Sequence, residues 1–297
     1  MTTPARPAVL VIGEALMDIT DSADGVSETP GGGPANIALG LARRGVAAAL
    51  LTHLGTDERG RAIARHLEAS GVGILPESFH DAPTSTARAT LDATGAATYE
   101  FDIAWEVPRG LSLGETPVIH TGSLATFLNP GADAVQALLD AHPDAIVTFD
   151  PNIRPGLVGS PEGARSRFER IARRARVVKL SDEDAAFLYA DLDIAGVIAA
   201  ILDLGPAIVA VTRGGSGATL ATREGTVDVT APRVDVVDTI GAGDTFMASL
   251  LVEPLLRAGT MPTAAQLTEI GTRAAAAAAI TVGRAGADLP WARELDD

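Results

Sequence analysis

Cysteine is absent from this sequence of 297 residues, and lysine occurs only once, at Lys179. The lack of cysteine excludes disulfides, thiol catalysis, iron–sulfur clusters and cysteine-ligated zinc. The single lysine excludes a GxxxxGK[ST] phosphate-binding loop, because Leu180 follows it. If the protein handles phosphate, we therefore expect backbone amides, arginine and metal ions to bind it.

Basic residues are also scarce, with 23 of them against 38 acidic residues and a formal net charge of −15. Such an acidic excess repels nucleic-acid backbones and anionic lipid surfaces, so we expect neither partner. No uncharged apolar stretch reaches the ~18 residues of a membrane span. The first 19 residues also lack the continuous apolar core and cleavage site of a signal peptide. The sequence therefore predicts a cytoplasmic location.

Short apolar runs alternate with amphipathic runs along most of the chain, whose composition is 46% hydrophobic. This alternation predicts an α/β fold, with a mostly parallel sheet covered by helices on both faces. The predicted strands are 8–13, 47–54, 117–121, 145–149, 175–180, 207–212 and 227–237. The predicted helices are 34–44, 58–70, 130–141, 161–174, 182–189, 193–203 and 244–256.

Two stretches depart from this rhythm. Residues 84–104 alternate small or apolar residues with polar ones around Thr94-Gly95, which is typical of a half-exposed hairpin. Residues 15–34 are expected to form a polar loop that ends in three glycines. We interpret the two stretches, over about 14–34 and 84–106, as a small β lid inserted into a single domain that covers 1–297.

Residues 238–246, DTIGAGDTF, form the most informative segment. Gly241 and Gly243 allow an anion to approach backbone amides at the N-terminus of the following helix, where the helix dipole favours negative charge. Asp244 places a carboxylate at the same point, which is unfavourable beside phosphate unless the group acts as a general base. The alternative is that Asp244 only caps the helix.

This segment resembles the C-terminal signature, DTxGAGD, of the ribokinase/PfkB carbohydrate kinases. The resemblance extends over nearly the whole chain through further motifs in the family's order. These are Gly13-Glu14 with Asp18, 31–38 (GGGPANIA), Gly55 with Asp57 and Gly60, 150–154 (DPNIR), 211–217 (VTRGGSG) and 284–287 (RAGA). The resemblance implies a three-layer ribokinase-like fold and phosphoryl transfer from ATP to a sugar hydroxyl.

The resemblance also implies a role for each matching residue. Asp244 is the expected general base, and an anion hole is expected from the amides of Ile240 to Gly243, which include Gly241 and Ala242. The residues expected to bind the sugar are Asp18, Gly32, Gly33, Asn36, Arg154 and Asp244. The residues expected along the nucleotide phosphates are Thr212, Gly214, Gly215, Gly217 and Gly243. For Arg154 the alternative is a structural or surface role.

Two cation sites follow from the same resemblance. A monovalent cation, K⁺, is expected at Asp238, Ile240, Arg284 and Gly286, bound partly by backbone. Mg²⁺ is expected to arrive with ATP and to be held mainly by phosphate oxygens and water. The family's Asn-x-x-Glu motif appears here as 181–184 (SDED), so Glu183 and Asp184 compete for its magnesium and phosphate role.

The choice of substrate depends on two short segments. GGGPAN and 120–124 (HTGSL) are similar to fructokinase sequences, which favours the 6-hydroxyl of a ketohexose, fructose first. Ribokinase, 2-keto-3-deoxygluconate kinase and nucleoside kinase activities remain open. Two alternatives come from other classes: a non-catalytic sugar-binding regulator, and an α/β hydrolase that uses Ser216. Because lids often pair between subunits in this family, a homodimer through the lid is also expected.

Overall fold

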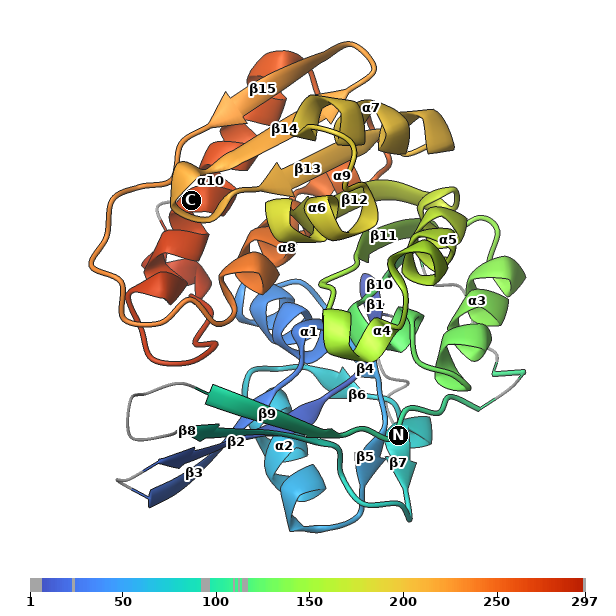
Figure 1. The fold of residues 1–297 in the computed structure, drawn as a ribbon, viewed down its shortest axis with the longest axis vertical. Helices are drawn as coiled ribbons and strands as arrows, with labels where there is room; N and C mark the ends of the chain where they lie inside the picture. The colour runs from blue at the N-terminus through green and yellow to red at the C-terminus, as the bar shows by residue number, and fades with distance from the viewer. Residues whose placement is uncertain are drawn as a thin grey trace.

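The computed structural model describes residues 7–22, 25–91, 97–108, 110, 111, 113 and 117–295. Within these residues the largest sheet has nine strands (Figure 1). In spatial order they are β15 (Gly225–Val229), β14 (Ala218–Thr222), β13 (Ile208–Thr212), β12 (Ala175–Ser181), β11 (Ile146–Asp150), β10 (Val118–Gly122), β1 (Val9–Ile12), β4 (Ala48–Leu51) and β6 (Gly73–Ile74). Neighbouring strands are parallel from β13 to β6, whereas β14 and β15 pair antiparallel at one edge.

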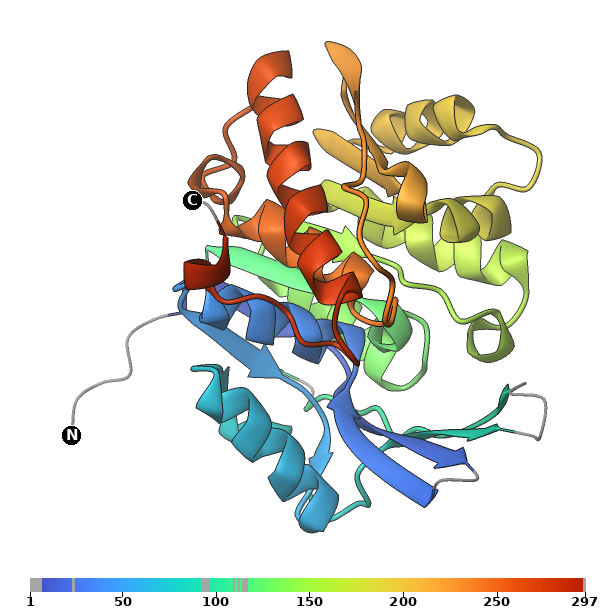
Figure 2. The same ribbon diagram turned by 90° about the vertical axis from the view of Figure 1, so that its left-hand side faces the viewer.

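Helices cover both faces of this sheet because the strand side chains alternate between two hydrophobic cores. In β1, Val9 and Val11 belong to one core, and Leu10 and Ile12 belong to the other. The first core is covered by α1 (Gly33–Arg43), α2 (Glu58–Ala69), α8 (Ala242–Val252) and α10 (Ala264–Val282). The second is covered by α3 (Gly131–Ala141), α5 (Pro161–Ala172), α6 (Asp182–Leu188) and α7 (Ile194–Leu204). Figure 2 shows α10 in red on one side of the sheet and the yellow helices on the other.

A second sheet of four strands projects from the end of the molecule that holds α2 (Figure 2). Its order is β3 (Gly25–Gly31), β2 (Leu16–Ser22), β8 (Thr86–Leu91) and β9 (Ala97–Asp102). The antiparallel pair β8–β9 matches the predicted hairpin, whose Thr94-Gly95 turn lies outside the described residues. The two stretches interpreted as a lid therefore form one sheet.

The loop predicted over 15–34 is wrong, because most of this segment forms the antiparallel pair β2–β3. Residues 16, 17 and 19 of β2 are buried, whereas β3 is mostly exposed. A further short parallel pair, β5 (Leu54–Gly55) with β7 (Phe79–His80), lies beside this region.

Further elements differ from the prediction, among them the short β6, β7 and α4 (Pro155–Val158), which were not predicted. The strand predicted over 227–237 ends at Val229, because the chain leaves the sheet before Pro232, which has no N–H to donate to a ladder. The helix predicted over 244–256 is divided at Pro254, where α9 (Pro254–Arg257) follows α8. Strand β14 was not predicted at all, although each of its residues is buried.

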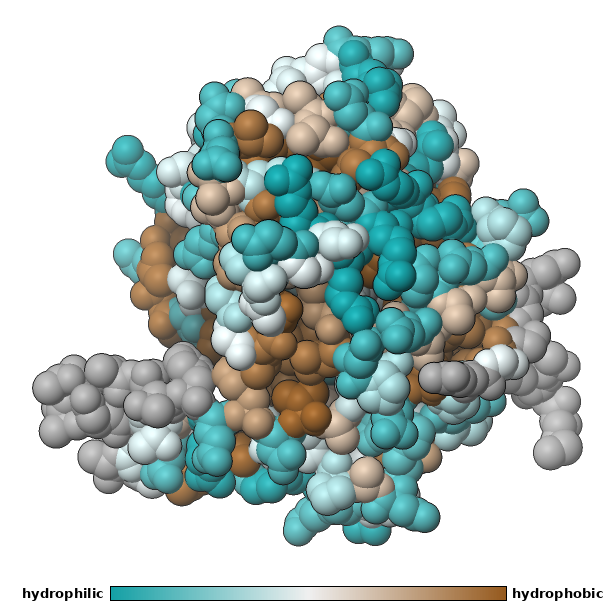
Figure 3. Space-filling view, turned by 45° about the vertical axis from the view of Figure 1, so that its right-hand side comes forward, coloured by the Kyte–Doolittle hydropathy of each residue, from teal (hydrophilic) through white to brown (hydrophobic). Residues whose placement is uncertain are grey.

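The remaining short helix, α4 (Pro155–Val158), follows the end of β11. Hydrophilic residues cover much of the face shown in Figure 3, and hydrophobic residues gather in the lower middle of that face. Within the described ranges, none of the helices combines the length and the apolar character needed to cross a membrane.

Candidate active site

A narrow cleft lies where the carboxyl ends of β10 and β11 meet the N-terminal ends of α1 and α8. Parallel α/β sheets bind ligands at this end of their strands, because the loops there are free to form a site. The residues that line the cleft are Gly33, Pro34, Ile37, His120, Gly122, Ser123, Asp150, Asn152 and Asp244. The cleft thus brings together residues from the first, middle and last parts of the chain.

Asp244 lies in the first turn of α8, and only 7% of its surface is exposed. Burial raises the pKa of its carboxyl group, while a hydrogen bond from Asn36 and the charges of Lys179 and Arg154 oppose that rise. The Asn36 Nδ2 group donates to Asp244 Oδ2 over 2.8 Å. A buried carboxylate held at the start of a helix and open to a cleft is well placed to accept a proton.

The turn before Asp244 presents backbone N–H groups. Gly241 has a φ of 79°, a conformation that favours glycine, and it precedes the first residue of α8. The Ile240 amide donates to Asp238 Oδ1, and the Ala242 amide donates to the Thr239 carbonyl oxygen. Within the described residues the amides of Gly241 and Gly243 have no acceptor, so they are available to an anion.

Two polar residues of the predicted sugar site face this carboxylate. Asp18 on β2 is close enough to Asp244 and Arg154 for their charges to affect its pKa, which burial raises to about 6. Arg154 follows β11, and its guanidinium donates to the Asn152 side-chain oxygen over 2.8 Å. A side chain at Gly33 would approach Asn152 Nδ2 to 2.8 Å and Asp244 Oδ1 to 3.2 Å, so glycine keeps the cleft open.

Strained backbone also marks the cleft. Ser123 and Asn152 have φ values of 52° and 36°, and they are the only non-glycine residues with positive φ in the described part of the chain. Both line the cleft. Next to them, Glu14 is buried and accepts a hydrogen bond of 3.1 Å from the Ala125 amide. Backbone strain of this kind concentrates at functional sites.

The predicted nucleotide loop lies at the end of β13. Thr212 is the last residue of that strand, and the exposed Gly214 and Gly215 have room for a side chain, since a Cβ atom at either would meet nothing within 4 Å. Gly217 differs, because a side chain there would collide with the backbone carbonyl of Val229. Gly217 is therefore required by packing against the end of β15, whatever its role toward a nucleotide.

The structure brings together the backbone of the predicted potassium site. Asp238 Oδ1 accepts from the Ile240 amide over 3.0 Å, and its Oδ2 accepts from the Gly286 amide over 2.9 Å. One carboxylate thereby joins the turn before α8 to the segment after α10. The Arg284 side chain points elsewhere, to Glu294 at 2.7 Å, which leaves only its backbone for a cation.

Asp184, predicted at the magnesium site, is buried and structurally engaged. Its Oδ1 accepts from the Ile153 amide over 2.7 Å, and its Oδ2 accepts from the Ser181 amide over 3.0 Å. Glu183, its competitor for the same role, is exposed. Within the described residues no group of three or more His, Asp or Glu is placed to hold a metal ion.

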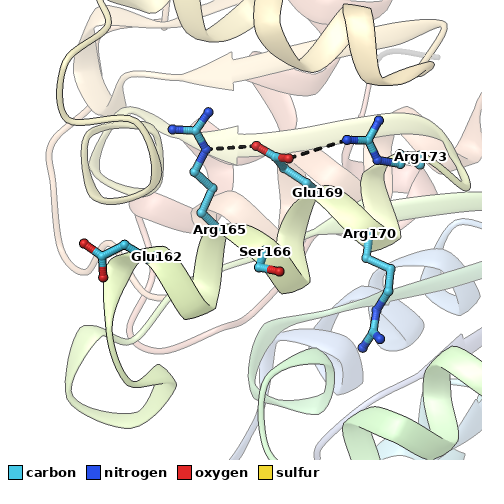
Figure 4. A pocket seen from close by; sticks show the side chains of 6 residues that line it. All are labelled: Glu162, Arg165, Ser166, Glu169, Arg170 and Arg173. Carbon is cyan, nitrogen blue, oxygen red and sulfur yellow. Dashed lines mark hydrogen bonds and ion pairs between the residues drawn. The ribbon is translucent and has the colours of Figure 1, made fainter.

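A larger hollow lies elsewhere, along the outer face of α5 (Figure 4). None of the predicted site residues lines it, and three of its side chains pair with one another: Glu169 contacts Arg165 at 2.9 Å and Arg173 at 3.6 Å. Its one paired carboxylate, Glu169, is held between two arginines. The chemistry therefore points to the narrow cleft around Asp244.

The only lysine of the sequence lies next to the cleft, packed against the Gly243 backbone. Lys179 is 4% exposed, and its Nζ donates to Asp150 Oδ2 over 2.9 Å. Sequence reasoning also missed His120 and Asp150 as cleft residues. The available signal was that a lone lysine sits inside an apolar strand, where an ammonium group needs a partner.

The profile of the pfkB family carbohydrate kinases matches residues 6–293. The chain belongs to this family. It is a carbohydrate kinase, that is, a phosphotransferase with an alcohol group as acceptor. The ribokinase-like fold that the sequence predicted is confirmed by the similarity to solved sugar kinases of this family.

Several named proteins resemble this pfkB-family kinase over almost its full length. A fructokinase from Salmonella typhimurium is 32% identical over 302 residues, which cover 97% of this chain and 98% of that protein. A double mutant of fructokinase from Vibrio cholerae O395, solved with fructose, ADP and potassium ion, has a TM-score of 0.80 and 26% identity and covers 94% of this chain and 93% of its own. An aminoimidazole riboside kinase from Salmonella enterica, solved with its riboside and an ATP analogue, has a TM-score of 0.82, 26% identity and coverages of 97% and 98%.

Proposed function

We propose that this carbohydrate kinase transfers the γ-phosphoryl group of ATP to a primary hydroxyl of a small sugar, with fructose as the first choice. The observation that carries the proposal is the placement of Asp244, a buried carboxylate in the cleft, directly after two unpaired backbone amides. A base and an anion-binding turn within four residues are what phosphoryl transfer to an alcohol requires.

In the proposed reaction, Asp244 accepts the proton of the sugar hydroxyl as its oxygen attacks the γ-phosphorus. The bond between that phosphorus and the β–γ bridging oxygen breaks, and ADP leaves with the bond's electron pair. The amides of Gly241 and Gly243 would donate to the phosphoryl oxygens as charge spreads over them. Asn36 would hold the carboxylate of Asp244 in position through its 2.8 Å hydrogen bond.

The sugar would lie between the second sheet and the body of the molecule. Asp18 and Arg154 come from these two sides and interact electrostatically, so they are suited to bind hydroxyl groups of one small polar ligand. Gly32 and Gly33 would let the sugar approach the start of α1. The four-stranded sheet would then act as a lid that excludes water from the reaction.

ATP, Mg²⁺ and K⁺ are the proposed cofactors. The ATP phosphates would follow the exposed backbone of Gly214 and Gly215 toward Gly243. Because both oxygens of Asp184 are engaged by backbone amides, Mg²⁺ would be held chiefly by phosphate oxygens and water. K⁺ would bind where the Asp238 carboxylate joins the Ile240 and Gly286 segments, and the Vibrio cholerae fructokinase structure, which contains potassium ion, supports this proposal.

Fructose is favoured by the GGGPAN and HTGSL segments and by similarity to named fructokinases. A riboside is the second candidate, since the riboside kinase structure is equally similar to this chain. Ribose and 2-keto-3-deoxygluconate remain as further alternatives. The homodimer through the lid and the cytoplasmic location stay predictions.

The test is ADP release by the purified protein with ATP, Mg²⁺ and one of four acceptors: fructose, ribose, 2-keto-3-deoxygluconate or adenosine. We expect the highest kcat/KM with fructose, and a kcat lower by about 10²–10⁴-fold for Asp244→Asn, with sugar affinity retained. ADP release that does not depend on any sugar, or near-normal turnover by Asp244→Asn, would refute the proposal. Sugar binding without ADP release would indicate a regulator, and ester hydrolysis without ATP would indicate a hydrolase.

A further inference from the structure

A buried ion pair lies directly beneath the Asp244 turn. Lys179 on β12 and Asp150 on the neighbouring strand β11 are 4% and 2% exposed, and their charged atoms are 2.9 Å apart. A buried pair is expensive to desolvate, and replacing it with apolar residues often stabilises a protein. Its presence in an otherwise apolar sheet therefore calls for an explanation other than stability.

The pair touches the proposed anion hole from below. Lys179 Nζ lies 2.8 Å from the point that a Cβ atom of residue 243 would occupy, so the ammonium group packs against the Gly243 backbone. Within the described residues Asp150 is the only hydrogen-bond acceptor of Lys179 Nζ, although an ammonium group has three donors. Asp150 Oδ1 has no described partner either, and Asp150 lines the cleft.

Around this ion pair, carboxylates outnumber the lysine. Burial alone would lower the pKa of Lys179, but the carboxylates of Asp150, Asp184 and Asp244 outweigh burial and raise it. Burial lowers the pKa of His120 on β10 to about 3, and the Lys179 ammonium contributes a further lowering. The Lys179 ammonium is thus the buried positive charge near three carboxylates, at the turn where the proposed reaction brings a negatively charged phosphoryl group.

We infer that Lys179 is a positioning residue for phosphoryl transfer: held by Asp150 beneath the Gly243 turn, it keeps Asp244 ionised and adds positive potential to the anion hole. This inference rests on the proposed function of Asp244 as the base. The charged and polar groups around Asp244 include Asn36 on α1, Asp18 on β2, His120 on β10, Asp150 on β11, Asn152 and Arg154 after β11, and Lys179 on β12. Of the two cations among them, Lys179 is the buried one.

Removing Lys179 should raise the pKa of Asp244, and removing the charge of Asp150 should lower it. A purely structural role of the pair would not shift this pKa in opposite directions. Lys179→Met removes the positive charge and keeps the side-chain length. Because the pKa of Asp244 should then rise, the acidic limb of the pH profile of kcat/KM should shift to higher pH by about one unit. The kcat should fall by about 10- to 100-fold. Asp150→Asn removes a negative charge and keeps the lysine, so it should move the acidic limb to lower pH.

Arg176→Met is the matched control, because Arg176 is a half-buried cation at the other end of the same strand, where it donates to the Gly259 carbonyl oxygen. This variant should leave the acidic limb and kcat at the wild-type values. The thermal midpoint of each variant shows whether it folds. If Lys179→Met does not fold, Asp150→Asn carries the test alone.

Three outcomes would overturn the inference. These are an unchanged acidic limb in Lys179→Met or Asp150→Asn, a shift of the same sign in both variants, or a loss of kcat in Lys179→Met no larger than that in Arg176→Met. Asp244→Asn, measured in parallel, separates the two proposals. If it retains turnover, the proposed base is wrong; if it loses turnover while Lys179→Met does not, only the role of Lys179 is wrong.

Discussion

Asn36 and Asp244 are 208 residues apart in the sequence, and their side chains are joined by a buried hydrogen bond of 2.8 Å. The bond connects the first turn of α1 with the first turn of α8, so two helix N-termini meet at one carboxylate. The sequence predicted both residues as substrate ligands. The structure adds that the Asn36 amide holds the carboxylate oxygen that would otherwise be free to rotate.

Replacing Asn36 by alanine should impair Asp244 in two ways. The hydrogen bond from Asn36 lowers the pKa of the Asp244 carboxyl group, so its loss should raise that pKa. The acidic limb of the pH profile of kcat/KM should therefore shift to higher pH by about one unit. The carboxylate also loses its fixed orientation, and kcat should fall by about tenfold. Gln136→Ala is the control, because Gln136 makes the same amide-to-carboxylate bond with Asp140 over 2.8 Å on the exposed side of α3. A normal pH profile for Asn36→Ala would contradict this prediction.

Gly243→Ala should disrupt the anion-binding turn with little loss of stability. The new methyl group would lie 2.8 Å from Lys179 Nζ, and that ammonium group cannot move aside without breaking its ion pair with Asp150. We therefore expect the turn to shift and kcat to fall by about 10²–10³-fold, while the thermal midpoint falls by only a few degrees. Gly225→Ala, where a Cβ meets no atom within 4 Å, should have normal kinetics. Unchanged kcat in Gly243→Ala would argue against this packing.

Most of the parallel sheet could be predicted from the sequence because its longer strands are mainly apolar runs, whereas the two-residue strand β6 was not predicted. Strands β2 and β3 could not be predicted, because β3 is exposed along most of its length and carries no apolar pattern. Its pairing with β2 depends on the antiparallel register from Leu16 opposite Gly31 to Ser22 opposite Gly25, which only the folded chain displays.

The candidate site was predictable to the extent that single motifs encode it. The DTIGAGD segment alone identifies Asp244 and its glycines. The charged residues near that carboxylate could not be predicted from a motif, because Lys179 and Asp150 lie on separate strands. They meet only when β11 and β12 pair. The same holds for Glu14, whose hydrogen bond to the Ala125 amide spans 111 positions.

The monovalent cation can be tested by exchange. We expect kcat/KM to be highest in K⁺ and lower in Li⁺ or Cs⁺, because a site held in place by the Asp238 carboxylate has a fixed size. Asp238→Ala removes the acceptor of both the Ile240 and Gly286 amides, so the two segments should separate and the preference for K⁺ should disappear. Initial rates at constant ionic strength measure both effects. Wild-type rates that do not depend on the cation would exclude the site.

Glu14 makes the stability of the protein depend on pH. Burial is the largest effect on this carboxyl group and raises its pKa from 4.5 to about 7, against hydrogen bonds from Ser123 and Ala125. Because the folded-state pKa is the higher one, the folded protein binds this proton more tightly than the unfolded chain. The resulting stabilisation is complete below about pH 4.5 and is lost as the pH rises toward 7.

Glu14→Gln should remove this pH dependence, because glutamine does not titrate. The free energy of unfolding of the wild type, relative to Glu14→Gln, should therefore decrease between pH 5 and pH 8, by on the order of 2–3 kcal/mol. Asp18, whose pKa is raised to about 6, acts in the same direction but is present in both proteins and cancels. Urea denaturation at several pH values measures the difference, with the exposed Glu77→Gln as a control. A difference that stays constant or grows with pH would show that Glu14 is ionised in the folded protein without cost.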